Sequence, residues 1–309
     1  MSDPLPASVP HAVASVGPAI DTAEIARLEE IARRIRVEIV RTVNHARGGH
    51  LGGPLSVTDI LTALYFRILR VRPDDPGWPD RDRLVLSKGH SSIALYGAMA
   101  LRGYFPVEEL ATFDAVHSRL QGHPDMCLLP GLDMSTGSLG MGISAGVGMA
   151  LGARLAGRDC RTFVVLGDGE CQEGSVWEAA MVGARYGLAN LVAIVDHNKL
   201  QQYGWPGDTP EHRLPPEAPG ELLAKWTAFG WRVLEVDGHA MGELVRTLEE
   251  ATRGEGRPTV VIAHTVKGRG VSFMEDRYYW HTRLLKPEEF AQAMAELGEP
   301  APAVEGGPT

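Results

Sequence analysis

The sequence lacks the features that mark secreted, membrane-spanning and nucleic-acid-binding proteins. Its 309 residues include only three cysteines, which have no CxxC or metal-type spacing and cannot all pair. No apolar run reaches roughly 18 residues, and the N-terminus has no basic region followed by an apolar core, so neither a transmembrane helix nor a signal peptide is expected. A net charge of −9 argues against nucleic acid or an anionic membrane as a partner. We expect a protein of the reducing cytoplasm.

The chain also lacks the common nucleotide-binding loops. No GxGxxG or Walker-type sequence follows a predicted strand, which argues against an ordinary nucleotide-binding domain. Glycine is nevertheless abundant, with 36 residues that gather in turns beside polar side chains. Tight loops around a phosphate require such glycines. An apolar content of 44% predicts a sizeable packed core.

Short apolar runs alternate with helical patterns along the chain. Strands are predicted at residues 83–86, 162–166, 191–195, 231–236 and 259–264. Helices are predicted from Asp21 or Thr22 through Val43 and at 56–69, 91–101, 106–113, 145–155, 176–186, 220–229, 241–252 and 287–297. This order is typical of an α/β fold with a central, mostly parallel sheet and helices on both faces. We expect residues 19–298 to form a single domain between a flexible arm, 1–18, and a flexible tail, 299–309.

The stretch from Arg161 to Leu200 predicts a strand–helix–strand unit whose strands both end in polar residues. Asp168 stands between two glycines after the first strand, and Asn198 follows the second. Ligands of open α/β sheets bind outside the carboxyl ends of the strands, so Asp168 and Asn198 should face one crevice. Carboxylate and amide oxygens suit Mg²⁺, which usually bridges to the phosphates of a substrate or cofactor.

Polar residues follow the other predicted strands too. His90 follows the first strand, and His239 and Lys267 follow the last two. One such residue is more often a turn former, but five at corresponding strand ends favour a ligand site. Residues 135–142 form a glycine loop that opens a helix and could hold phosphate, with close packing of a glycine-rich helix as the equal alternative. Lys267 and Arg269 could likewise bind phosphate or lie in a solvated loop.

Four histidines stand in distinctive settings: His50, His90, His123 and His281. Histidine can transfer protons near neutral pH or donate to a phosphate or a sugar hydroxyl, although any single one is more often structural than catalytic. Glu173 could be a surface residue at a helix start or a buried carboxylate that organises an active site.

Several motifs resemble those of the transketolase family. GDGECQEG at 167–174 with DHNKLQ at 196–201 is similar to the motif with which thiamine enzymes bind thiamine diphosphate. GGHLGGPLS, LSKGH, QGHPD, STGSLGMGIS, FGWRVLEVDGH and TVKGRGVSFMED with a following WH are similar to transketolase in particular. The resemblance runs from about Ile31 to Leu297 and covers the N-terminal half of a transketolase, the part that binds the cofactor's diphosphate.

The resemblance implies cofactors and a set of site residues. Thiamine diphosphate would bind together with Mg²⁺, for which Ca²⁺ or Mn²⁺ could substitute. Asp168, Asn198 and the backbone carbonyl of Leu200 would hold the metal. The diphosphate and thiazolium would be lined by His90, Gly137, Leu139, Gly169 and His281, with Lys267 at the rim.

The resemblance also implies catalytic roles. His50 and His123 would contact the hydroxyls of the donor sugar and assist proton transfer, and His281 would act beside them. Glu173 would couple two active sites across a dimer. Four residues depart from the family's pattern: Gly49, Ser138, Met141 and His197. These departures leave the proposed metal ligands and histidines unchanged, but they bear on the choice of substrate.

The sequence stops at Thr309, where the second domain of a transketolase, with the glutamate that activates the cofactor's aminopyrimidine, should begin. The chain thus resembles the small subunit of a split transketolase. This implies a C-terminal partner subunit with the pyrimidine-binding domain, an α2β2 heterotetramer, and sugar or sugar phosphate substrates. Together the subunits would transfer a two-carbon ketol unit from a ketose to an aldose.

Two alternatives stay open at this point. The first keeps the cofactor but changes the reaction, to a specialised ketol or acyl transferase of secondary metabolism or an enzyme resembling deoxyxylulose phosphate synthase. The second is a non-catalytic assembly subunit that stabilises its partner. Intact Asp168, Asn198 and histidine motifs argue against the second.

Overall fold

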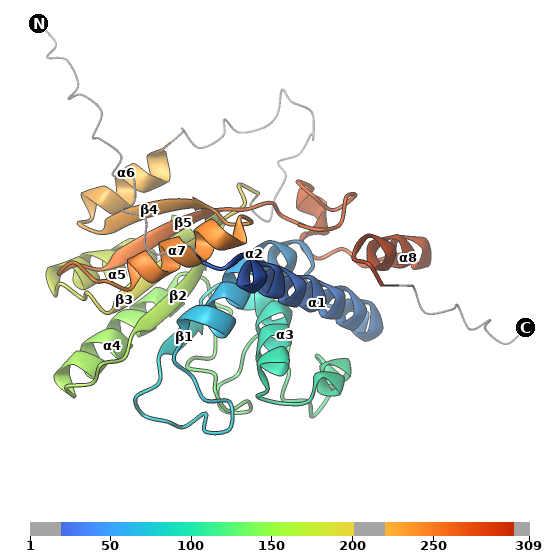
Figure 1. Ribbon diagram of the computed structural model, residues 1–309, viewed down its shortest axis with the longest axis horizontal. Coiled ribbons are helices and arrows are strands. Elements are labelled where there is room, and N and C mark those ends of the chain that lie inside the picture. The colour runs from blue at the N-terminus through green and yellow to red at the C-terminus, as the bar shows by residue number, and fades with distance from the viewer. Residues whose placement is uncertain (1–19, 201–219, 300–309) are drawn as a thin grey trace, which may run out of the picture.

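A sheet of five parallel strands forms the centre of the computed structural model, which describes residues 20–200 and 220–299 (Figure 1). The strands are β1 (Arg83–Leu86), β2 (Thr162–Gly167), β3 (Leu191–His197), β4 (Arg232–Asp237) and β5 (Thr259–His264). Their order in the sheet is β1-β2-β3-β5-β4, and every neighbouring pair is parallel. The carboxyl ends of all five strands therefore lie at one edge, which is where the predicted site residues follow.

Eight α-helices surround this sheet in the described residues. They are α1 (Thr22–Ala46), α2 (Gly52–Ala63), α3 (Ser92–Arg102), α4 (Met141–Leu155), α5 (Gly174–Arg185), α6 (Glu221–Ala228), α7 (Met241–Ala251) and α8 (Pro287–Glu296). The first helix begins where the sequence predicted, because the side chain of Asp21 accepts a hydrogen bond from Ala23 N at 3.2 Å and caps it.

Both faces of the sheet are buried, because its strands consist mostly of apolar residues. Phe163 and Val165 of β2 face a core formed with α1, α2, α3, α7 and α8, whereas Val164 and Leu166 face a second core formed with α4, α5 and α6. Successive side chains of a strand point to opposite faces, and a parallel sheet covered on both sides needs apolar residues on both. Figure 1 shows α7 across β4 and β5, with α1, α2 and α3 beside the sheet. The predicted fold class is confirmed.

Several predicted boundaries were wrong. The second helix begins at Gly52, inside a segment that its glycines marked as a break, and runs into a π-helical turn, Leu64–Ile68. Helix α4 begins at Met141, four residues before its predicted start. The predicted helix at 106–113 is a 3-10 helix over residues 107–112, and strand β3 extends two residues further than predicted, through His197. In α2 every residue is buried, so tertiary packing outweighs the weak helix propensity of glycine.

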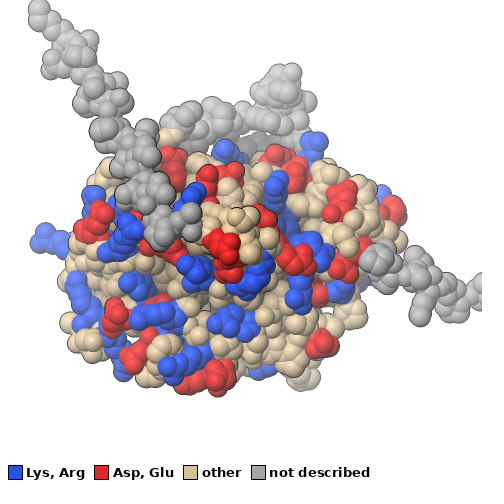
Figure 2. Space-filling view, viewed as in Figure 1, with Lys and Arg blue, Asp and Glu red and all other residues tan. Residues whose placement is uncertain are grey.

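Some predictions fall outside the described residues. These are the arm at 1–18, Gln201 of the diphosphate motif, and all of the predicted tail except Glu299. That residues 19–298 form a single domain stays a prediction. Among the helices that the structure describes, none has the length and apolar character to cross a membrane. On the face drawn in Figure 2, basic and acidic side chains are interspersed.

Candidate active site

Asp168 and Asn198 lie at the carboxyl ends of the adjacent strands β2 and β3, as the sequence predicted. The Asp168 carboxylate accepts a hydrogen bond from Lys199 N at 2.5 Å, which ties the two strand ends together. Asn198 Oδ1 accepts one from Leu200 N at 3.1 Å. Burial, together with a neighbouring carboxylate, raises the pKa of Asp168. A cation at this edge would relieve that cost.

The oxygen donors at this edge fit a hard cation with few protein ligands. They are the Asp168 carboxylate, the Asn198 amide oxygen and the backbone carbonyl of Leu200. Within residues 20–200 and 220–299, no three histidine, cysteine, aspartate or glutamate side chains are grouped to hold a metal. Mg²⁺ held by one carboxylate completes its octahedral shell with water and phosphate oxygens. The residues present therefore fit a Mg²⁺ ion that binds together with a phosphate-bearing molecule.

The four predicted histidines converge, although they come from four separate segments. The ring of His50, just before α2, lies 5.2 Å from that of His90 and 6.2 Å from that of His123, measured between centroids. The ring of His281 lies 5.1 Å from that of His50 and 5.0 Å from that of His90. Side chains 231 positions apart in the sequence thus form one cluster beside the strand ends.

Three of these imidazoles are neutral at physiological pH. Burial, together with neighbouring lysine and histidine side chains, lowers the pKa of His50 to about 4 and that of His281 to about 3. Burial, followed by the charge of Lys88, also lowers the pKa of His90. A neutral imidazole presents one donor and one acceptor, so these rings can bind hydroxyl groups or accept a proton.

Lys267 lies inside the site. Its Nζ is 2.9 Å from the carbonyl oxygen of Leu200 and 3.0 Å from Nδ1 of His281, and its side chain is 2% exposed. Gly52 makes room for it, because a Cβ there would lie 2.9 Å from Lys267 Cγ. Burial lowers the pKa of Lys267 to about 8, so most of the population still carries a charge near pH 7. This ammonium group is placed to meet an anion near the proposed metal ligands.

Two other residues of the predicted loops lie outside the site. Arg269 is exposed and pairs with Glu275 at 3.5 Å, so for it the solvated-loop alternative holds. His239 Nδ1 lies 2.6 Å from the Asp59 carboxylate, and its Nε2 accepts from Val266 N at 2.8 Å. His239 therefore holds the loop before Lys267 rather than joining the histidine cluster.

The glycine loop at 135–140 lies against the cluster. A Cβ at Gly137 would be 3.1 Å from His123 Cδ2, and one at Gly89 would be 2.7 Å from Gly137 N. The loop and the His90 turn therefore touch at Gly89, against the backbone of residues 136 and 137 and the hydroxyl group of Thr136. The N–H of Gly140, at the start of α4, donates to Glu170 at 2.8 Å and is already engaged.

The packing alternative for the glycine-rich helix also holds, further along α4. A Cβ at Gly142 would collide with Ser87 Oγ, and one at Gly146 would collide with Val164 Cγ2. The two interpretations of this stretch thus apply to different residues. Its first glycines border the site, and the later ones bring α4 close to β1 and β2.

Glu170 is a buried carboxylate that the sequence motifs did not single out. It is 2% exposed and accepts hydrogen bonds from Ser87 Oγ at 2.5 Å and from Gly140 N at 2.8 Å, and burial raises its pKa. Glu173 is exposed in this chain, and its predicted role across a dimer stays a prediction. Glu170 was missed because the sequence does not reveal the 3-10 turn Gly169–Gln172, which directs this side chain back under the strand ends.

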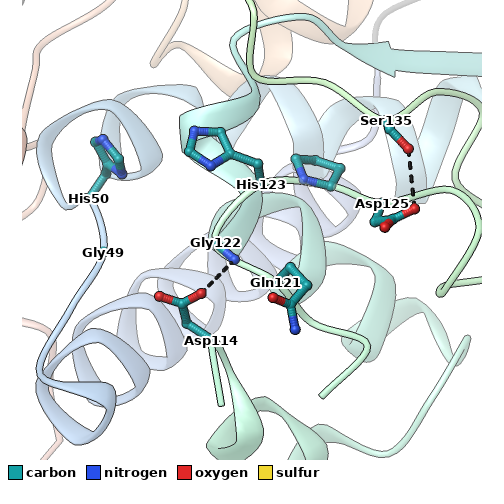
Figure 3. Close-up of a pocket in the computed structure, with 9 residues that line it drawn as sticks. Gly49, His50, Asp114, Gln121, Gly122, His123, Asp125 and Ser135 are labelled. Carbon is teal, nitrogen blue, oxygen red and sulfur yellow. Dashed lines mark hydrogen bonds between the residues drawn. The ribbon is translucent and has the colours of Figure 1, made fainter. Parts of the chain in front are cut away.

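An open pocket of about 510 Å³ adjoins His50 and His123 (Figure 3). Two hydrogen bonds shape its wall: Asp114 Oδ1 accepts from Gly122 N at 3.1 Å, and Ser135 Oγ donates to Asp125 at 3.2 Å. The first closes the loop that carries His123, and the second joins this loop to the glycine loop. The pocket is lined by Gly49, His50, Asp114, Gln121, Gly122, His123, Pro124, Asp125 and Ser135. The polar side chains among these residues suit a hydroxylated ligand.

The sequence matches known proteins over nearly its whole length. The model of the transketolase family's thiamine diphosphate binding domain matches residues 28–304. The 6-deoxy-6-sulfo-D-fructose transketolase subunit of Clostridium sp. strain MSTE9 is 43% identical over 87% of this chain and 96% of that protein. An apulose-4-phosphate transketolase subunit of Phocaeicola vulgatus is 42% identical over 89% of this chain and 95% of that protein.

Solved transketolases share the fold. The Campylobacter jejuni enzyme superposes with a TM-score of 0.79 at 31% identity, over 90% of this chain and 43% of that chain. A Pichia stipitis transketolase in complex with sedoheptulose 7-phosphate gives 0.78 at 31% identity, over 89% and 41%. The chain thus spans about two fifths of these enzymes. It belongs to the transketolase family, in which it corresponds to the N-terminal thiamine diphosphate binding domain.

Proposed function

We propose that this chain is the N-terminal subunit of a transketolase that depends on thiamine diphosphate and Mg²⁺. Together with a separate pyrimidine-binding subunit, it transfers a two-carbon ketol unit from a ketose or ketose phosphate to an aldose. The observation that carries the proposal is the convergence of four histidines beside the Asp168 and Asn198 strand ends. A purely structural subunit has no need for a cluster of four imidazoles, two of which line an open pocket.

The residues at the strand ends would hold the cofactor's diphosphate. Asp168, Asn198 and the Leu200 carbonyl are the metal ligands, and Lys267 supplies a further positive charge next to Leu200. The rest of the diphosphate and thiazolium site is formed by His90, Gly137, Leu139, Gly169 and His281. When bound, thiamine diphosphate supplies a carbon nucleophile for cleavage of the ketose.

The histidines next to the pocket would handle the sugar. His50 and His123 face the pocket, where they bind donor hydroxyls and hold or accept the protons that move during ketol transfer. His50 suits this role because its low pKa keeps it neutral and able to accept a proton. His281 contributes in the same way from beside Lys267.

A partner subunit would complete the site, since the similar proteins from Clostridium and Phocaeicola are named as transketolase subunits. We further propose an α2β2 heterotetramer. Supporting this, α4 and α5 expose apolar side chains on neighbouring surfaces, including Met141, Met181 and Val182. Contiguous exposed apolar surface marks contact sites in soluble proteins. Glu173, at the start of α5, would couple the two active sites from this surface.

The thiols support a reducing compartment. Cys127 is exposed and Cys160 is buried, and neither forms a disulfide. An exposed thiol persists best in a reducing compartment, and we propose the cytoplasm.

The direct test is reconstitution. The purified chain is mixed with its candidate partner, thiamine diphosphate and Mg²⁺, and cleavage of a panel of ketoses and ketose phosphates is measured with and without an aldose acceptor. We expect turnover only with both chains and both cofactors present. Full activity of this chain by itself would contradict the split architecture, and an inactive complex that binds no cofactor would contradict the proposed function.

Assembly is tested by light scattering of the chain, of its partner and of their mixture. A particle with the mass of two copies of each subunit is expected. Met181→Glu, which places a charge on the exposed surface of α5, should shift the mixture toward smaller particles without lowering the thermal midpoint of the isolated chain. A mixture that stays as separate monomers would contradict the heterotetramer.

A further inference from the structure

A buried carboxylate, Asp196, lies beneath the proposed metal site and takes no part in the proposed chemistry. It is the sixth residue of β3 and is fully buried. Its Oδ2 accepts hydrogen bonds from Lys88 Nζ at 2.5 Å and from Ser56 Oγ at 2.7 Å, and its Oδ1 accepts one from Thr265 Oγ1. Lys88 is itself 2% exposed, so this is a buried ion pair with hydrogen bonds to two hydroxyl groups.

The donors to Asp196 come from three segments that also carry site residues. Lys88 stands two positions before His90, and Thr265 stands two positions before Lys267. Ser56 lies in the first turns of α2, which begins directly after the His50 segment. One carboxylate therefore joins β3 to the segments that supply His50, His90 and Lys267.

Asp196 also contacts the side chain of Asn198. Asn198 Nδ2 lies 3.5 Å from Asp196 Oδ2 and 3.4 Å from Ser56 Oγ, whereas its Oδ1 accepts from Leu200 N. The amide nitrogen thus faces the buried acceptors, which leaves the amide oxygen on the side of the other proposed metal ligands. An amide that presented its nitrogen to the metal could not coordinate it.

The energetics favour a positioning role over a stabilising one. Removing two charges from water carries a large desolvation cost, and a buried pair seldom stabilises a protein more than apolar residues of the same volume do. Partners in the outer shell of a metal site, in contrast, fix the orientation of its ligands, and their loss weakens metal binding about 10- to 100-fold.

We propose that Asp196, neutralised by Lys88, is a positioning residue that fixes the side-chain orientation of the magnesium ligand Asn198. The inference rests on the proposed function, because it presupposes a metal at Asp168 and Asn198. Beyond that function, it states that the orientation of Asn198 depends on Asp196, a residue that contacts neither the metal nor the substrate.

The test measures metal binding rather than activity. Mn²⁺ is titrated into the full-length chain, by itself and with its partner subunit, in the presence of thiamine diphosphate, and free Mn²⁺ is followed by electron paramagnetic resonance. Asp196→Ala should raise the Mn²⁺ dissociation constant about 10-fold or more. Asp196→Asn should raise it less, because an amide oxygen can still accept from Asn198.

A matched control separates positioning from folding. Asp82 is a buried carboxylate at the opposite end of the sheet, where it accepts from Arg70 N and Arg161 N, both at 2.8 Å. Asp82→Ala should lower the thermal midpoint as Asp196→Ala does, yet leave Mn²⁺ affinity unchanged. If Asp196→Ala does not fold, Ser56→Ala removes the second acceptor of the Asn198 amide and should weaken Mn²⁺ binding several-fold.

The outcomes distinguish the two proposals. Wild-type Mn²⁺ affinity in a folded Asp196→Ala chain, or an equal loss in Asp82→Ala, would overturn the positioning role and leave the proposed function intact. A wild-type chain that binds no Mn²⁺ with thiamine diphosphate, with or without the partner, would overturn the proposed function itself.

Discussion

The ammonium group of Lys267 lies 2.9 Å from the backbone carbonyl oxygen of Leu200. That carbonyl is a proposed magnesium ligand, so a fixed positive charge stands beside the position of a second cation. Burial, followed by the charge of Lys88, lowers the pKa of Lys267 to about 8, so the protein by itself holds this charge at a cost. An anionic diphosphate bound at this edge would offset the cost of the buried charge.

Replacing this lysine should therefore separate stability from binding. In Lys267→Met the buried charge is lost, so the thermal midpoint of the isolated chain should stay level or rise. Affinity of the reconstituted complex for thiamine diphosphate should fall about 10- to 150-fold, because a hydrogen bond to a charged group contributes about 1.5–3 kcal/mol. Arg269→Met is the matched control, since Arg269 is exposed and pairs with Glu275. Equal losses in both variants would place Lys267 outside the cofactor site.

Asp168 should show a similar conflict between folding and function. Burial raises its pKa, so its charge is held at a cost in the metal-free chain. Asp168→Asn should therefore raise metal-free stability at pH 7 while abolishing the Mg²⁺ dependence of thiamine diphosphate binding, measured by calorimetry with and without chelator. Asp159→Asn, at an exposed carboxylate, should change neither quantity. Retained Mg²⁺ dependence in Asp168→Asn would exclude this residue as a ligand.

The contact between the His90 turn and the glycine loop leaves no space for a methyl group at Gly89. A Cβ there would lie 2.7 Å from both Gly137 N and Thr136 C, and backbone atoms cannot rotate away. Gly89→Ala should cost about 1–3 kcal/mol of stability, as overpacking does, and should weaken cofactor binding because the loop must move. Gly152→Ala in α4, with nothing within 4 Å, should be neutral or stabilising in the isolated chain. Unchanged stability and binding in Gly89→Ala would contradict the close contact.

The histidine cluster should make the chain acid-sensitive. His50 has a pKa near 6.5 when unfolded and about 4 when folded, so between these values the unfolded chain binds more protons. Its contribution to stability is present above pH 6.5 and is lost as the pH falls toward 4; it is at most about 3 kcal/mol, since one pKa unit corresponds to about 1.4 kcal/mol.

Denaturant melts of the isolated chain between pH 7 and pH 4 test this. The free energy of unfolding should fall less steeply with decreasing pH in His50→Gln than in the wild type. The exposed His117 provides the control, and His117→Gln should follow the wild-type curve. Parallel curves for all three proteins would show that His50 is not held neutral by the fold.

Predictions from local pattern were accurate where one segment carries the signal. The alternation of apolar strands and helices located all five strands of the sheet, and the polar residues after β2 and β3 indicated the edge beside which the histidines cluster. Predictions were poorer where packing decides. The start of α2 at Gly52 was missed because this glycine allows close contact with Lys267, and nothing in the local sequence reveals that neighbour.

The choice between similar residues also required the tertiary structure. Glu170 and Glu173 stand three positions apart in one motif, yet only Glu170 turns inward to Ser87 and the start of α4. Lys267 and Arg269 differ by two positions, and only Lys267 enters the site.

The fold class and the chemistry available at the strand ends can be predicted from local sequence, because a parallel arrangement brings every strand's carboxyl end to one edge. Which polar residues meet at that edge depends on contacts between distant segments. His50 and His281 become neighbours, and Asp196 becomes the common acceptor for Lys88, Ser56 and Thr265, through contacts that span 69 to 231 positions. Such contacts depend on how closely α2 and the loops approach the sheet. That distance is short because a few glycines, which have no side chain, allow close packing there.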